Sequence, residues 1–160
     1  GTRIGFEAGV GLEKTGVVGF AGRRAVSMLR VLFREAARAD ADTLVRACLA
    51  QQGIAVFHSS QGVEGLCLLL IAKPGQDALH AACDEVRRLL PGAQVKLREN
   101  LAALLALCRT TREVPKLAAA MESAGVPVHH LVQTPPGALF CVNDSQYETA
   151  LRAAYALAFG

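Results

Sequence analysis

Four stretches of the chain place apolar residues three or four positions apart, the spacing of one helix face. In one of them, Leu79, Cys83 and Leu90 share a face, and the charged residues Asp84 and Arg88 lie opposite. This pattern predicts amphipathic helices packed on a core. The stretches cover residues 44–49, 79–90, 114–121 and 147–158.

Apolar runs between these helices predict strands, because they are short and bounded by turn residues. Turns at Gln61-Gly62 and at residues 135–137 join two pairs of runs as hairpins. The runs cover residues 25–31, 54–60, 65–72, 93–98, 103–109, 126–133 and 138–142, with a separate run at 15–20.

The predicted elements repeat along the chain. From residue 25 their order is β-α-β-β-α-β, and about 78 residues later it is β-α-β-β-α. The first helix of each repeat ends at a glycine, Gly53 or Gly125, directly before an apolar strand. The second repeat lacks a fourth strand, and the run at 15–20 is available to complete it.

A βαββαβ repeat closes as an antiparallel sheet with two helices on one face. The sequence therefore predicts an α+β fold of two ferredoxin-like units, with the first unit inserted in the second. The expected boundaries are 24–100 for the first unit and 15–23 plus 101–160 for the second, after a linker at 1–14.

Composition and charge limit the kinds of molecule that the chain is expected to bind. With 52% hydrophobic and 19% charged residues, the chain is expected to form a packed core. The net charge of +3 comes from scattered basic residues, so we expect no nucleic-acid partner. The longest apolar run, 66–72, is too short to span a bilayer, and residues 1–6 carry no signal-peptide core. We expect no membrane partner and, from five cysteines without a C-x-x-C pair, a cytoplasmic location.

Four segments carry a family resemblance. GTRI at residues 1–4 is similar to a G-T-x-I segment, and LAQQGIAV at 49–56 is similar to LaeaGInV. Two further parts of the chain are also similar to family segments. They are TGVV at 15–18 with RAVSMLRV at 24–31, and the ending from ALRAAY at 150–155 to Phe159. Together they resemble the C-terminal regulatory region of aspartokinases, in which paired ACT units follow the kinase domain.

The resemblance implies a parent enzyme that phosphorylates the side-chain carboxylate of aspartate, the first step toward lysine, threonine and methionine. It implies that residues 1–14 end the kinase domain and that this fragment is not itself an enzyme. ATP and magnesium are then expected only in the missing kinase domain, with no cofactor here. The implied partners are an amino-acid effector such as lysine or threonine, a second copy of the chain through the ACT units, and the chain's own kinase domain.

The resemblance also implies effector sites. In each unit, the loop after the first strand and the start of the next helix offer free N–H groups to a carboxylate. Asp40 and Arg112 stand where the family has glycine, Phe57 stands where it has aspartate, and Thr134-Pro135 replaces Ser-Glu. The candidate effector-binding residues are Leu32, Arg34, Asp40, Val56, Phe57, Ser59 and Ser60 in the first unit, and Arg112, Gln133 and Thr134 in the second.

Metal binding and catalysis are disfavoured. His129 and His130 are neighbours on a predicted strand, so their side chains point to opposite faces and do not converge on one ion. Cys141 is the one thiol near these histidines, and a buried apolar role explains it more simply than a nucleophile. We therefore assign no catalytic and no metal-binding residue.

Two other functions remain open. One is a structural ACT pair that dimerises the parent enzyme and binds no effector. The other is a stand-alone ferredoxin-like protein. Thermal shift with lysine, threonine and methionine distinguishes a sensing module from a structural one.

Overall fold

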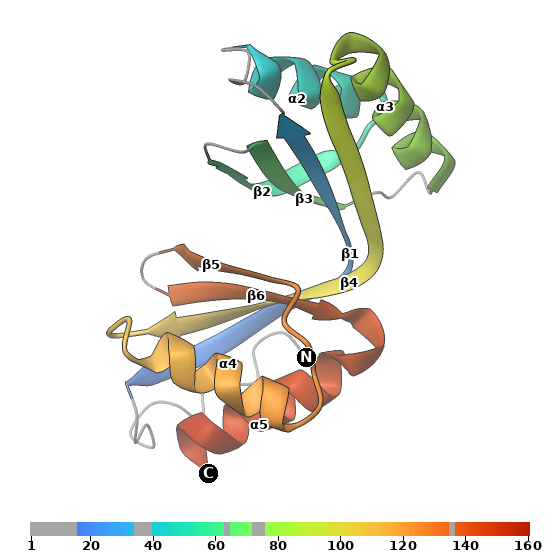
Figure 1. Cartoon of the computed structure of the whole chain (residues 1–160). Coiled ribbons are helices and arrows are strands. Elements are labelled where there is room, and N and C mark those ends of the chain that lie inside the picture. Colours follow the sequence, from blue (N-terminus) through green and yellow to red (C-terminus); the bar gives the residue numbers. More distant parts are fainter. Residues whose placement is uncertain (1–15, 34–39, 63–64, 72–75, 135–136) are drawn as a thin grey trace. The chain divides into compact units, whose positions relative to one another are not determined.

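The computed structural model describes residues 16–33, 40–62, 65–71, 76–134 and 137–160. The predicted linker at 1–14 and the candidate Arg34 lie outside these residues. The elements are β1 (Val17–Phe33), α2 (Ala41–Gln51), β2 (Ala55–Gln61), β3 (Gly65–Ile71), α3 (Gln76–Leu89), β4 (Ala93–Cys108), α4 (Glu113–Ser123), β5 (His130–Thr134), β6 (Gly137–Asn143), the short 3-10 helix η1 (Asp144–Gln146) and α5 (Tyr147–Phe159) (Figure 1).

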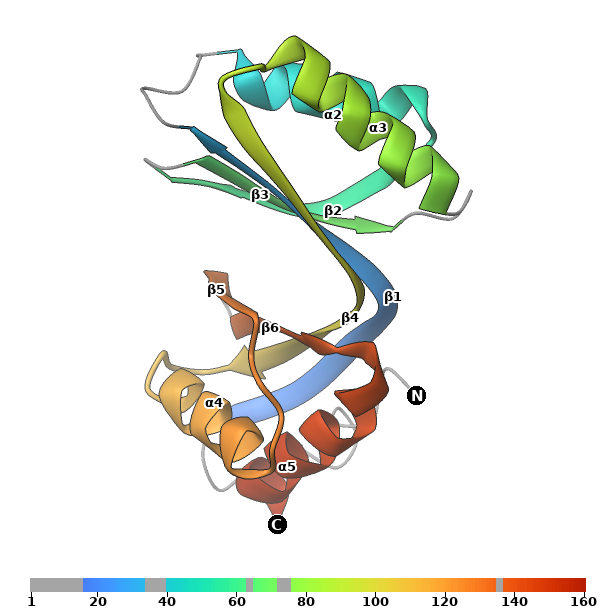
Figure 2. The ribbon, with the colours of Figure 1, turned by 45° about the vertical axis from the view of Figure 1, so that its right-hand side comes forward.

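The chain divides into two compact units. We call residues 26–99 the inserted unit, and residues 1–25 with 100–160 the flanking unit. The strand order β2-β3-β1-β4-β6-β5 gives each unit four strands, because β1 and β4 contribute to both (Figures 1 and 2). The predicted α+β class with two ferredoxin-like units is confirmed.

Four of the predicted strands are halves of two long ones. The runs 15–20 and 25–31 fall within β1, and the runs 93–98 and 103–109 fall within β4. Ala25 and Asn100 adopt left-handed backbone angles, with φ of 56° and 59°, where each strand passes from one unit to the other. Such a residue breaks the alternation of side chains without ending the strand, so the sequence pattern looked interrupted there.

One further local prediction was wrong. The strand expected from residue 126 begins only at His130, because the N–H of Val126 still bonds to the carbonyl of Met121 in a helix-ending turn around Gly125. In addition, α5 begins at Tyr147 without a side-chain cap, directly after the short helix η1.

In the inserted unit, α2 and α3 cover one face of the sheet (Figure 2). Alternation along β1 sends Leu29 and Val31 toward these helices and leaves Met28 and Arg30 on the opposite face. A β-bulge between Val56 and His58 shifts the pairing of β2 with β3. The buried core is Leu29, Val31, Ala41, Val45, Cys48, Leu49, Ile54, Leu66, Leu68, Leu70, Leu79, Ala82, Cys83, Val86 and Leu90.

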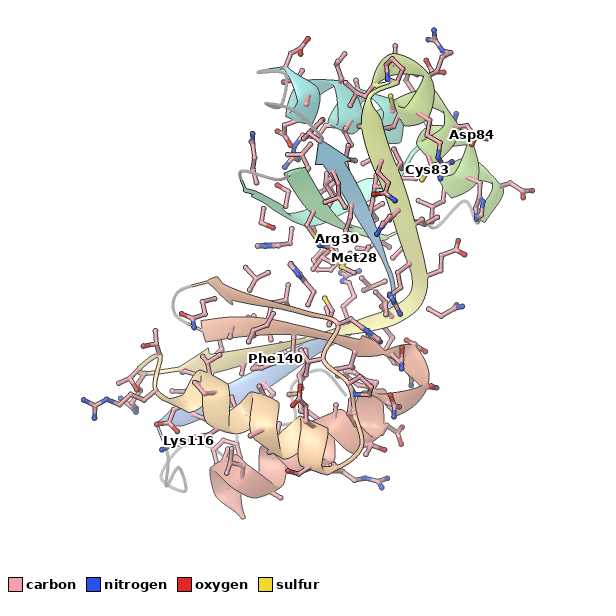
Figure 3. All side chains as sticks on the ribbon, viewed as in Figure 1. Met28, Arg30, Cys83, Asp84, Lys116 and Phe140 are labelled. Atoms are coloured by element: carbon pink, nitrogen blue, oxygen red, sulfur yellow. The ribbon has the colours of Figure 1, made fainter. Side chains whose placement is uncertain are left out.

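In the flanking unit, α4 and α5 pack on a second core, which includes Phe140 of β6 (Figure 3). The rings of Phe20, Tyr155 and Phe159 meet with centroids 4.9–6.4 Å apart and join α5 to β1. Among the described residues, no helix is both long enough and apolar enough to cross a membrane.

Asp144 anchors the last residues of β1 in the flanking unit. Its carboxylate accepts a hydrogen bond from the N–H of Ala25 at 3.0 Å and pairs with the Arg24 guanidinium, also at 3.0 Å. The Arg24 guanidinium in turn lies over the Tyr147 ring, 5.5 Å from its centroid. The hydrogen bond from Arg24 lowers the pKa of the Asp144 carboxyl, and the N–H of Ala25 adds to the effect.

Replacing Asp144 should show how much its contacts with Arg24 and Ala25 stabilise the fold. Asp144→Ala removes the acceptor of the Ala25 N–H and should lower the free energy of unfolding by about 1 kcal/mol at neutral pH. A carboxyl whose pKa is lowered by folding stabilises the fold above its unfolded pKa of about 3.9, and this contribution is lost as the pH falls through the folded pKa. Urea unfolding should therefore show a smaller difference between parent and variant at about pH 2 than at pH 7. An equal difference at both values would contradict the assignment.

Candidate functional site

The inserted unit has a pocket of about 410 Å³ at the end of β1. The hairpin between β2 and β3 forms its other side. We call this the inserted-unit pocket, and its lining residues are Arg30, Leu32, Ser60, Gly62, Gly65, Leu66 and Cys67.

The flanking unit has a pocket of about 200 Å³ where β4 ends and α4 begins. Backbone hydrogen bonds hold this turn, from the N–H of Arg109 to the carbonyl of Gly16 at 2.8 Å and from the N–H of Val114 to the carbonyl of Thr111 at 3.2 Å. We call it the flanking-unit pocket, and its lining residues are Cys108, Arg109, Thr110, Thr111, Val114, Gln133 and Gly137.

The two pockets lie near equivalent strand ends of the two repeats, but on opposite faces of their sheets. Arg30 and Ser60 both pair with Cys67 on the helix-free face of the inserted unit, whereas Cys108 and Val114 belong to the helix-covered core of the flanking unit. Gly65 begins β3 and pairs with Leu32, while Gly137 begins β6 and pairs with Leu107. A Cβ atom at Gly65 would lie 2.0 Å from the carbonyl oxygen of Val31, and one at Gly137 would lie 1.8 Å from that of Ala106. Only glycine lets the third strand approach the first this closely.

Both pockets combine a cation with hydroxyl groups. The inserted-unit pocket has Arg30 and Ser60, and the flanking-unit pocket has Arg109 with Thr110 and Thr111. Among the described residues, no aspartate or glutamate lines either pocket. Guanidinium and hydroxyl donors suit a carboxylate, since charge-assisted hydrogen bonds from arginine are strong and directional.

A buried acid lies close to the flanking-unit pocket. Glu113, in the first turn of α4, is 7% exposed, and among the described residues its Oε2 has no hydrogen-bond partner. The Lys116 amine is 3.9 Å from that oxygen. Burial raises the pKa of the Cys108 thiol, and the negative charge of Glu113 raises it further, so this carboxylate is within electrostatic reach of the pocket. Arg109 and Glu113 thus offer opposite charges to a zwitterion.

Comparison with known proteins rests on structure. No protein-family model and no curated protein sequence matches the chain. An aspartate kinase from Clostridium acetobutylicum superposes with a TM-score of 0.80 at 15% identity, over 92% of this chain and 36% of that one. The regulatory subunit of aspartate kinase from Thermus flavus superposes with a TM-score of 0.71 at 21% identity, over 89% of this chain and 98% of that one. Escherichia coli aspartokinase III in complex with lysine and aspartate superposes with a TM-score of 0.68 at 15% identity, over 91% of this chain and 34% of that one.

This chain has the fold of an aspartate kinase regulatory region. It spans about a third of the length of the Clostridium kinase and nearly all of the Thermus regulatory subunit. The resemblance that the sequence segments show is therefore matched by the fold over most of the chain.

Three of the predicted effector-binding residues line the pockets of this regulatory fold. Leu32 and Ser60 meet in the inserted-unit pocket, and Gln133 lies in the flanking-unit pocket. Two others lie on the helix side of the β2 strand. Val56 packs against the core, and the Ser59 hydroxyl accepts a hydrogen bond from Arg46 of α2.

Among the remaining predicted residues whose side chains are described, Phe57, Asp40 and Arg112 line neither pocket. Phe57 is 37% exposed at the β-bulge. Asp40 directly precedes α2, is exposed, and accepts the Leu44 N–H on its carbonyl at 3.0 Å. Arg112 directly precedes α4 and is also exposed. Thr134 pairs with Gly137 through its backbone, and its side chain lies outside the described part of the chain.

The sequence interpretation missed the pocket glycines and the arginines. Gly65 and Gly137 had been assigned to strand starts and turns, yet each follows a hairpin at the same point of its repeat. Comparing the two repeats position by position would have identified them. Arg30 and Arg109 carried no such signal, because each belongs to an apolar strand run.

His129 takes part in a structural chain of hydrogen bonds. His129 Nε2 is 2.8 Å from Asn143 Oδ1, Asn143 donates to Gln146, and Gln146 donates to the carbonyl of Gly125. This chain of bonds holds the end of α4 beside η1. Among the described residues, no group of three metal-ligating side chains converges.

Exchanging the pocket glycines should destabilise the fold. Gly65→Ala and Gly137→Ala each force a Cβ into a backbone carbonyl, so we expect the free energy of unfolding to fall by about 1–3 kcal/mol. Gly62→Ala is the matched control in the same hairpin, because nothing lies within 4 Å of its Cβ position. Chemical denaturation measures the difference, and equal stability of Gly62→Ala and Gly65→Ala would contradict the steric argument.

The pocket thiols are expected to be unreactive. Burial raises the pKa of the Cys67 thiol, and the nearby Arg30 offsets this only in part. Burial also raises the pKa of Cys108. Since the thiolate is the reactive form, labelling with a chromogenic disulfide at neutral pH should be at least about tenfold slower in the native protein than after unfolding. A rapidly labelled thiol in the native chain would contradict this.

Proposed function

We propose that this chain is the regulatory region of an aspartate kinase, and that its two pockets bind an amino-acid effector. The observation that carries the proposal is the fold, which matches the Thermus flavus aspartate kinase regulatory subunit over 89% of this chain. Each pocket has a glycine-built wall, an arginine and at least one hydroxyl group.

The donors favour an α-amino acid bound through its carboxylate. In the inserted-unit pocket, Arg30 and the Ser60 hydroxyl are the carboxylate donors we propose. In the flanking-unit pocket, Arg109 has this role, and the buried charge of Glu113 favours the ammonium group. Lysine or threonine is the class of ligand that the family resemblance implies, and the E. coli relative was solved with lysine and aspartate.

Regulation by such a ligand requires two states of the parent enzyme. An effector shifts an equilibrium only by binding one state more tightly than the other. In our proposal the parent is an aspartate kinase that holds ATP and magnesium in a separate kinase domain. The chain would transmit effector binding to that domain and pair with a second copy of itself.

Thermal unfolding of the chain with lysine, threonine or methionine tests the proposal. At a ligand concentration of about 100 times its dissociation constant, binding to the native state adds about 2.7 kcal/mol. For a chain of this size, that raises Tm by roughly 5–10 °C, and the rise should saturate.

Substitutions in the two pockets show where the effector binds. Arg30→Ala with Ser60→Ala should abolish the shift that arises in the inserted-unit pocket, and Gln133→Ala should weaken binding in the flanking-unit pocket. Arg87→Ala is the control, since Arg87 pairs with Asp84 on the exposed face of α3. If no amino acid shifts Tm at millimolar concentration while sedimentation shows a dimer, the chain is a structural dimerisation module instead.

A further inference from the structure

A second, strongly basic pocket lies in the inserted unit, on the face of the sheet that carries no helices. It has a volume of about 420 Å³ and is lined by Met28, Arg30, Lys96, Leu97 and Arg98. We call it the basic pocket. Figure 3 shows Met28 and Arg30 projecting from β1 on the side away from α2 and α3.

Strand alternation brings the three cations together. On β4, Val95 and Leu97 pack against the helix-covered core, so Lys96 and Arg98 lie on the other face. On β1, Leu29 and Val31 face the same core, so Arg30 lies on the helix-free face together with Lys96 and Arg98. Because β1 and β4 are neighbours in the sheet, the three side chains converge from adjacent strands.

The positive charge of the basic pocket is uncompensated. Within the part of the chain that the structure describes, Arg30, Lys96 and Arg98 have no ion pair, and no acid lines the pocket. The nearest acid in sequence, Glu99, points to the helix side, where its carboxylate is 3.2 Å from His80 of α3. Most other arginines of this unit behave differently, as Arg46, Arg87 and Arg88 each pair with an acid on their own helix.

From this convergence we infer that the basic pocket binds a small oxyanion with two or more negative charges, a polyphosphate or a dicarboxylate. Arginine donates in a planar fork that matches carboxylate and phosphate oxygens, and lysine adds a third positive charge. Among the described residues, no aromatic side chain lines the pocket for a base to stack on, which disfavours a nucleic-acid strand.

The basic pocket is separable from the proposed effector site. Arg30 lines both it and the inserted-unit pocket, whereas Lys96 and Arg98 line only the basic pocket. A double variant, Lys96→Ala with Arg98→Ala, therefore removes two of the three charges and leaves the effector donors in place. Both side chains are exposed, so this variant should fold as the parent does.

Calorimetric titration of the full 160-residue chain with inorganic pyrophosphate tests the inference. We expect saturable binding that weakens as NaCl rises from about 0.05 to 0.3 M, because salt screens exposed charges. The double variant Lys96→Ala with Arg98→Ala should bind at least about tenfold more weakly. The matched control, Arg87→Ala with Arg88→Ala, changes the net charge equally on α3 and should bind as the parent does.

A parallel titration with succinate distinguishes the two ligand classes. Tighter pyrophosphate binding would assign a phosphate-bearing ligand, and tighter succinate binding a dicarboxylate. The inference is overturned if neither anion binds saturably, or if the Lys96 and Arg98 double variant binds as tightly as the control. These outcomes do not depend on whether an amino acid binds the inserted-unit pocket, so the two proposals fail separately.

Discussion

The sharing of β1 and β4 between two units is the constraint on which the rest of the structure depends. With 17 and 16 residues, these strands are about three times the usual length. Each unit needs its half of both strands to complete four strands under its helices. Ala25 and Asn100 mark the points of passage, and both adopt a left-handed backbone conformation that asparagine tolerates better than alanine. The bonds of Asp144 to Arg24 and Ala25 support the more costly of the two.

Strand sharing also explains the placement of the pockets. β1 is the first strand of the inserted unit, and β4 is the first strand of the flanking unit, so each ends beside the hairpin of its own repeat. At both ends a glycine, Gly65 or Gly137, lets the third strand touch the first. The same backbone contact therefore forms a wall of each candidate effector site and closes each sheet.

Charge distinguishes the pockets from the rest of the surface. Most arginines on the helices pair with acids one turn away, and such exposed pairs add little stability. Arg30, on the helix-free face, is not balanced in this way and lines two pockets. The three cations that line the basic pocket, Arg30, Lys96 and Arg98, lie on strands instead.

The sequence alone determined the fold class, the repeat and the apolar faces of the helices, because helix and strand periodicity are local properties of neighbouring residues. It also placed Leu32, Ser60 and Gln133 among the candidate residues that the pockets contain. Only the tertiary structure decided that β1 and β4 are continuous, since a left-handed residue breaks alternation without breaking the ladder. The tertiary structure also decided on which face of the sheet Ser59 and Ser60 lie, because the bulge after Val56 shifts side-chain alternation along β2. The convergence of Arg30 with Lys96 and Arg98 depends on strand pairing across more than sixty residues, which no local pattern encodes.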